Sequence, residues 1–135
     1  MNVHPFLFFC GRCEEAAHFY ASALGGEVGP IHRRGSCAAP GEDPEAVQYT
    51  EVIVGGQRLV QMSDCAQEST YSGFSVSLDV LTVEQAEVCF NALAEAGTIT
   101  LPFVPSFFSP GFGMLVDKFG VTWMVHAAPQ EGACC

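Results

Sequence analysis

The amino-acid sequence predicts an α+β fold of two modules, each with the element order β-α-β-β-β, related by pseudo-twofold symmetry around a cupped cavity. The first supporting observation is repetition, because strand-like runs and one helical segment follow in the same order in both halves, as after duplication. The second is a pair of tight turns, Gly55-Gly56 and Asp117 to Gly120, which join the last two strands of each half. We expect a single domain with module 1 over about residues 1–66, module 2 over about 72–128 and a tail over 129–135.

The size and charge of the chain narrow the possible partners. The 135 residues suffice for one domain with a sizeable core. Fifteen acidic and five basic residues give a formal net charge of −10, which opposes binding to nucleic acid and to anionic membranes. The N-terminus has no signal-peptide pattern and no apolar run is long enough to cross a bilayer, so we expect a cytoplasmic protein whose seven cysteines are mostly reduced.

The first half begins with an aromatic run over residues 3–9, which is too short for a helix and carries Pro5 near its start, as a first strand can. Residues 13–24 place apolar side chains at helical spacing, with Glu14 and Glu15 in the first turn and glycines at the end. The remaining expected elements are a strand over 27–34, a loop over 35–45, and strands over 47–54 and 58–63.

The second half begins with a strict alternation of large apolar and small polar residues over 74–80, which predicts a strand with one face against a helix. Thr82 and Gln85 predict a capping box for a helix that runs toward Gly97. The remaining expected elements are a strand over 98–104, a loop over 105–110, and hairpin strands over 114–116 and 121–125.

Strand alternation also predicts which side chains face the cavity. The set combines apolar side chains with hydroxyls and one amide, a composition that suits an uncharged or weakly polar organic ligand. The set contains no general base unless Glu51, Asp64 or Asp79 reaches inward, and Trp123 is expected beneath the helix. An aromatic loop ahead of the last hairpin covers either the cavity mouth or a subunit contact. The predicted ligand-binding residues are Leu7, Phe9, Gln61, Ser63, Ser75, Ser77, Phe107, Phe108, Thr122 and Met124.

Cysteines and histidines suggest further hypotheses, each with a plainer alternative. Cys10 and Cys13 form a CxxC at a strand-to-helix junction, where the helix N-terminus and Arg12 would favour a thiolate and a redox role; buried or incidental cysteines are the alternative. Vicinal Cys134 and Cys135 offer soft-metal capture or simply a frayed end. A metal pair of His4 and His126 is weighed against two ordinary histidines.

Several motifs resemble those of the vicinal-oxygen-chelate superfamily, which includes glyoxalase I, extradiol dioxygenases and bleomycin-resistance proteins. The resemblance covers nearly the whole chain, and the second-half motifs are its specific part. The matching segments are Phe19-Tyr20 ahead of Leu24-Gly25-Gly26, and Asp117-Lys118-Phe119-Gly120. Three segments are similar to the PhnB-like branch in particular, namely Met62-Ser63-Asp64, Tyr71-Ser72-Gly73-Phe74 and the turn followed by Trp123-Met124.

The resemblance implies two βαβββ modules, commonly a homodimer, and in the metal enzymes one His or Glu on each of four strands. The matching positions here are Pro5, Gln61, residues 73–75 and Met124, none of which is a His or a carboxylate. We therefore expect a protein that binds a small organic molecule, with no metal of the glyoxalase type and no cofactor. A metal-dependent lyase, isomerase or dioxygenase is the alternative, and a thiol-based role of Cys10 and Cys13 is the second. A methyltransferase label would have no support in these residues, because the sequence contains no nucleotide-cofactor motif.

Overall fold

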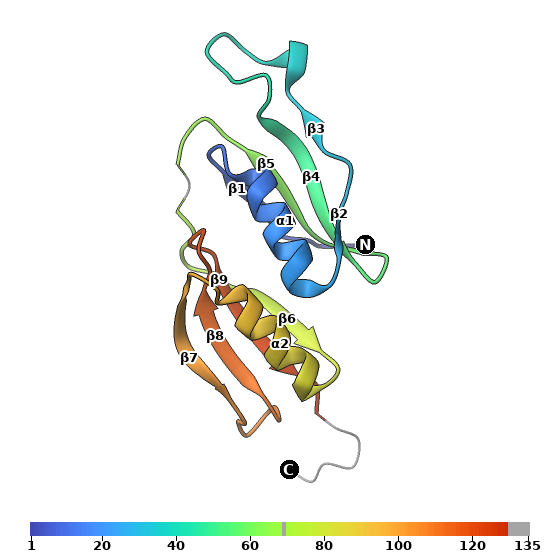
Figure 1. Cartoon of the computed structure of the whole chain (residues 1–135), viewed down its shortest axis with the longest axis vertical. Helices are drawn as coiled ribbons and strands as arrows, with labels where there is room; N and C mark the ends of the chain where they lie inside the picture. The colour runs from blue at the N-terminus through green and yellow to red at the C-terminus, as the bar shows by residue number, and fades with distance from the viewer. Residues whose placement is uncertain (69, 130–135) are drawn as a thin grey trace. The chain divides into compact units, whose positions relative to one another are not determined.

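The computed structural model describes residues 1–68 and 70–129, and the chain divides into two compact units, Met1–Ser69 and Thr70–Cys135. Each unit contains one mixed β-sheet and one α-helix (Figure 1), so the predicted α+β class is confirmed. Whether the units act as one domain stays a prediction, and Cys134 and Cys135 lie outside the described residues.

The first unit has its first strand in parallel with its last. The sheet order is β1-β5-β4-β2, with β3 also paired to β4, and only the β1–β5 pair is parallel. The elements are β1 (Phe6–Phe9), α1 (Cys13–Leu24), β2 (Glu27–Val28), β3 (His32–Arg33), a short 3-10 helix η1 (Gly35–Cys37), β4 (Val47–Val54) and β5 (Gln57–Asp64).

The second unit repeats this arrangement. Its sheet order is β6-β9-β8-β7, and its first and last strands again form the parallel pair. The shared strand order supports the duplication inferred from the sequence. The elements are β6 (Val76–Val80), α2 (Val83–Leu93), β7 (Thr98–Val104), β8 (Phe112–Val116) and β9 (Thr122–Ala127).

The predicted hairpin turns are confirmed by their backbone geometry. Gly55 and Gly56 have positive φ angles of 59° and 78°, which a side chain would strain, and they connect β4 to β5. The strand predicted over 27–34 is instead split into β2 and β3. The split falls at Pro30, which has no N–H to give to a strand ladder.

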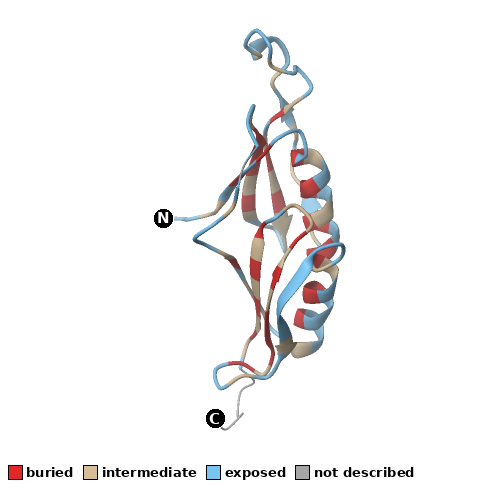
Figure 2. Cartoon of the chain, turned by 90° about the vertical axis from the view of Figure 1, so that its left-hand side faces the viewer, coloured by how far each residue is buried: buried red, intermediate tan, exposed pale blue. Residues whose placement is uncertain are grey.

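Each helix lies along one side of its own sheet, which Figure 2 shows together with the alternating burial of the strands. We call the covered side of each sheet the helix face and the other side the open face. The hydroxyl of Thr82 accepts a hydrogen bond from the N–H of Gln85 at 3.1 Å, which confirms the expected cap of α2. Within residues 1–68 and 70–129, neither helix has the length and apolar character needed to cross a lipid bilayer.

Candidate ligand-binding face

The register between β1 and β5 decides which side chains lie on the open face of the first sheet. Phe6 is the Cα partner of Gln61 and Phe8 that of Ser63, so these four residues share one face. Leu7, the partner of Met62, points the opposite way, as does Phe9, and both are buried on the helix face. The expectation that Leu7 and Phe9 share a face with Gln61 and Ser63 is therefore wrong by one residue of strand phase.

The open face of the first sheet carries a cluster of aromatic rings. The ring centroids of Phe6 and Phe8 are 4.9 Å apart, and that of Tyr49 lies 6.2 Å from Phe6 and 6.2 Å from His32. Phe6 is 38 % exposed and Phe8 is 48 % exposed. Large rings left this accessible beside one another are typical of a surface that contacts something apolar.

A chain of hydrogen bonds runs beside these rings. The amide of Gln61 donates to the Tyr49 hydroxyl at 3.1 Å, and that hydroxyl donates to Oε2 of Glu51 at 2.8 Å. The Arg58 guanidinium donates to the same carboxylate oxygen. The hydrogen bond from Tyr49, followed by that from Arg58, lowers the pKa of Glu51 below its ordinary value although burial opposes the shift. Glu51 therefore stays ionised at neutral pH and is a poor proton acceptor.

A hollow of about 580 Å³ adjoins the Glu51–Arg58 pair. Its volume falls within the range of about 300–1,000 Å³ that small-molecule sites occupy. Residues from the N-terminal segment, from β4 and β5, and from the turn between these strands line the hollow. They are Asn2, His4, Glu51, Ile53, Gly56, Gln57 and Arg58.

The open face of the second sheet gathers several residues of the predicted set. Ser77 is the Cα partner of Met124, and Thr122 lies two residues before Met124 on the same strand face. The centroid of Phe108 lies 5.7 Å from the His126 ring, which is on this face. Phe107, in contrast, is 96 % exposed. Ser75 directly precedes β6, where alternation places it on the side of Ser77.

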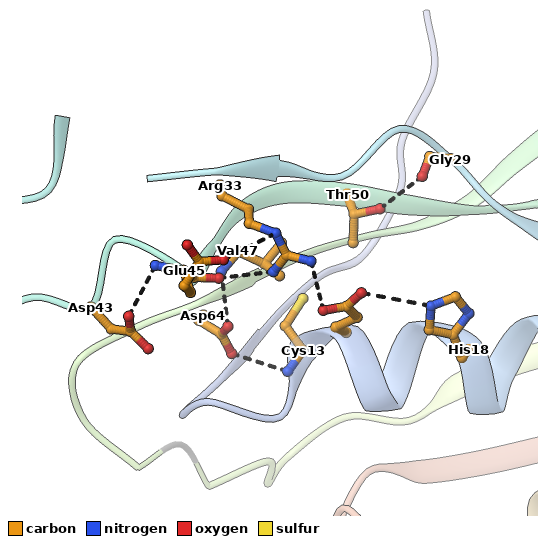
Figure 3. A network of polar contacts seen from close by, with 10 residues as sticks. Cys13, His18, Gly29, Arg33, Asp43, Glu45, Val47, Thr50 and Asp64 are labelled. Atoms are coloured by element: carbon orange, nitrogen blue, oxygen red, sulfur yellow. Dashed lines mark hydrogen bonds and ion pairs between the residues drawn. The ribbon is translucent and has the colours of Figure 1, made fainter. Parts of the chain in front are cut away.

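The three carboxylates considered as general bases have different surroundings. Glu51 lies on the open face, and Asp79 is exposed on the open face of the second sheet as the Cα partner of His126. Asp64 is buried and serves the backbone instead. Its Oδ1 accepts hydrogen bonds from the N–H groups of Gly11 at 2.9 Å and Cys13 at 3.0 Å, and its Oδ2 accepts from Val47 at 3.0 Å. Figure 3 shows the bonds from Cys13 and Val47.

The thiol predicted to pair with Cys10 lies in the core. Cys13, the first residue of α1, has no exposed surface. Burial, reinforced by the nearby charges of Asp64 and Glu14, raises the pKa of the Cys13 thiol from 9.0 to about 12. The sequence-based expectation that the helix N-terminus favours a Cys13 thiolate is therefore wrong, because desolvation outweighs the helix dipole.

The metal positions implied by the superfamily resemblance do not fit a hard or borderline divalent cation. Pro5 has no side-chain donor atom, the Gln61 amide is hydrogen-bonded to Tyr49, and Met124 offers only a thioether. Over the described ranges 1–68 and 70–129, no three His, Cys, Asp or Glu side chains group in a way that could hold a metal ion. The absence of a metal cofactor and the His4/His126 pair both stay predictions.

The sequence reading missed the rings of Phe6 and Phe8 and the Tyr49 hydroxyl. All four residues of β1 are apolar, so alternation gives no contrast from which to read the strand phase. The parallel pairing with β5, whose polar residues do alternate, carries the missing information. Tyr49 and Glu51 are two residues apart in β4, and this spacing is the signal that places both on one face.

The fold is shared with a solved structure of low sequence identity. The fosfomycin resistance protein FosX from Listeria monocytogenes, a vicinal-oxygen-chelate protein, matches with a TM-score of 0.67 at 11 % identity, covering 98 % of this chain and 95 % of the other. At this identity the match concerns the fold alone. The two units therefore share the fold of a vicinal-oxygen-chelate protein.

Nearer relatives identify the branch. The structure of protein PA1353 from Pseudomonas aeruginosa is 34 % identical with a TM-score of 0.85, covering 96 % of this chain and 99 % of the other. A PhnB protein from Bacillus cereus, described as a putative 3-demethylubiquinone-9 3-methyltransferase, is 30 % identical with a TM-score of 0.77, covering 95 % and 100 %. Protein YjdN of Escherichia coli (strain K12) is 31 % identical, covering 97 % of this chain and 98 % of its own length.

Residues 1–126 match the protein family described as 3-demethylubiquinone-9 3-methyltransferase, and the chain belongs to this family. Together with the PhnB and YjdN relatives, this places it in the PhnB-like branch of the superfamily.

Proposed function

We propose that this protein binds a small, uncharged or cationic aromatic compound on the open face of its first sheet, with no metal of the glyoxalase type. The observation that carries the proposal is the accessible pair of Phe6 and Phe8 beside the Tyr49–Glu51 hydrogen bond. Rings supply apolar contact area, and a few fixed polar groups set orientation, which is the usual composition of a small-molecule site.

The chemistry of Glu51 supports binding rather than proton abstraction. Its carboxylate is ionised at neutral pH and already accepts hydrogen bonds from Tyr49 and Arg58. A base of lowered pKa has little driving force to remove a proton from a carbon acid. Because the charge of Glu51 is paired with that of Arg58, the preference for a cationic over an anionic ligand rests on the formal net charge of −10.

The ligand class is tested with three probes that share one ring and differ in charge: benzylamine, benzyl alcohol and benzoate. Binding is measured by saturation-transfer NMR and by the shift of the melting temperature. We expect the amine and the alcohol to bind and the benzoate to bind least. Equal binding of benzoate, or no binding of any probe to the wild-type chain, would contradict the proposal.

Two variants locate the site. Phe8→Ala removes a half-exposed ring of the open face, and we expect about a tenfold loss of affinity, the size of one modest anchor contact of about 1.4 kcal/mol. Phe74→Ala is the matched control, because it removes the same side chain from a position of equal exposure, 48 %, outside the predicted ligand-binding set. An equal loss in both variants would show that the site lies elsewhere.

The family description names a methyltransferase activity, whereas the function proposed for this protein is ligand binding. A methyl transfer needs a bound methyl donor, and the sequence has no glycine-rich nucleotide motif between a strand and a helix. Incubation with S-adenosylmethionine in the same melting assay separates the two readings, because a methyltransferase would be stabilised by its donor.

Two further expectations accompany the proposal. The homodimer implied by the family resemblance is checked by light scattering after size-exclusion chromatography. The cytoplasmic location is checked by cell fractionation.

A further inference from the structure

The first unit contains a second cavity of about 330 Å³, located where β1 and β5 end. Two guanidinium groups lie in its wall, and each is paired with a carboxylate. Arg33 contacts Glu14 at 2.9 Å, and Arg34 contacts Glu42 at 3.5 Å. The wall also contains the carboxylates of Asp43, Glu45 and Asp64, so acidic groups outnumber the two guanidinium groups. The cavity wall also contains two thiols, those of Cys10 and Cys65.

The strand register brings these two cysteines together although they are far apart in sequence. Phe9 and Asp64 form the last Cα pair of the parallel β1–β5 ladder, and Cys10 and Cys65 directly follow these two residues at the ends of the two strands. The N–H of Cys65 donates to the carbonyl of Phe9 at 2.6 Å. The N–H of Gly11 donates to the carboxylate of Asp64 at 2.9 Å. Phe9 and Gly11, the residues on either side of Cys10, are therefore both hydrogen-bonded to residues at the end of β5.

This placement suits a covalent link. Neighbouring strands lie about 4.8 Å apart, and disulfides form between Cα atoms roughly 4.4–6.8 Å apart. Cys10 is exposed and Cys65 is half-buried, so reagents have access to both. The thiol of Cys65 contacts the carbonyl of Gln67 at 3.0 Å, a contact that it must leave to join Cys10.

We propose that Cys10 and Cys65 are a redox pair that closes to a disulfide at the wall of this cavity. The pair differs from the CxxC pair suggested by sequence spacing, because Cys13 is enclosed in the core at the start of α1. Cys37 is exposed but does not line the cavity, and it makes a natural control. The proposal is independent of ligand binding on the open face.

The oxidant is a small organic disulfide such as oxidised glutathione. One cysteine loses its proton, and its thiolate attacks the disulfide, forming a protein–glutathione S–S bond and expelling one glutathione thiolate, which takes up a proton. The second cysteine then loses its proton and attacks the protein sulfur of that bond, releasing the second glutathione. Two S–H bonds become one S–S bond in the protein, and one disulfide is reduced to two thiols.

The test uses the full chain and the positions of its basic residues. Trypsin cleaves after Arg12 and Arg58, so Cys10 lies in peptide 1–12, Cys13 in 13–33, and Cys65 in 59–118. The reduced chain is equilibrated in graded glutathione buffers, remaining thiols are alkylated, and the digest is analysed by mass spectrometry. We expect a disulfide-linked pair of peptides 1–12 and 59–118 to dominate.

Three variants make the assignment unique, because peptide 59–118 also contains Cys89. Cys10→Ser and Cys65→Ser should each abolish the linked pair, and Cys37→Ser should leave it unchanged. A link from 1–12 to 13–33, persistence of the link in Cys65→Ser, or only separate glutathione adducts on the wild-type chain would overturn the proposal.

Discussion

Replacement of Asp64 by alanine should cost a large part of the stability of the first unit. The carboxylate is only 5 % exposed and accepts hydrogen bonds from three backbone N–H groups, those of Gly11, Cys13 and Val47. A buried donor that loses its partner costs about 1–3 kcal/mol, and the bond to Gly11 is only partly buried, so the sum is about 3–6 kcal/mol. Native domains have about 5–15 kcal/mol in total.

The assay for Asp64 is urea unfolding followed by far-UV circular dichroism, with the loss read from the midpoint at constant slope. Asp64→Asn retains one carbonyl oxygen but turns an amide donor toward an N–H, so we expect a loss between zero and that of the alanine variant. Asp79→Ala is the control, because this carboxylate is exposed and its removal should change stability by less than about 0.5 kcal/mol. If Asp64→Ala is no less stable than Asp79→Ala, the proposed capping role is refuted.

Three further predictions concern stability. Asp117→Ala removes the acceptor of the N–H groups of Phe119 and Val121 and of the Trp123 indole, so the unfolding midpoint should fall and the fluorescence of this single tryptophan should shift to the red. Gly97→Ala would place a Cβ 2.3 Å from the Val116 carbonyl oxygen, and we expect a loss of more than about 1 kcal/mol in urea unfolding. Because the folded chain retains the Cys13 proton up to a pKa of about 12 and the unfolded chain loses it near 9.0, stability should fall as pH rises between these values, with a smaller slope in Cys13→Ala.

The sequence predicts the fold correctly where neighbouring residues alone determine the local structure. Glycines with positive φ made the β4–β5 turn predictable, and Thr82 marked the start of α2. The break between β2 and β3 was missed because a single proline, Pro30, outweighed a run that otherwise resembled one strand.

The candidate site was less predictable, because it depends on pairings between distant segments. The four apolar residues of β1 carry no alternation, so only the register with Gln61 and Ser63 assigns Phe6 and Phe8 to the open face. The CxxC spacing suggested a pair within one turn of chain. Tertiary packing instead places Cys13 in the core and brings Cys10 beside a strand more than fifty residues away.

The way Asp64 holds its surroundings has a consequence for how this protein can diversify. Its carboxylate holds two stretches of chain, residues 11–13 and residue 47, through main-chain N–H groups, which nineteen of the twenty amino acids possess. The side chains of Cys13 and Val47 are themselves buried, and Gly11 has a positive φ angle of 80°. New chemistry can therefore arise by substitution at exposed neighbours such as Cys10 and Arg12, while the backbone beneath them keeps its shape.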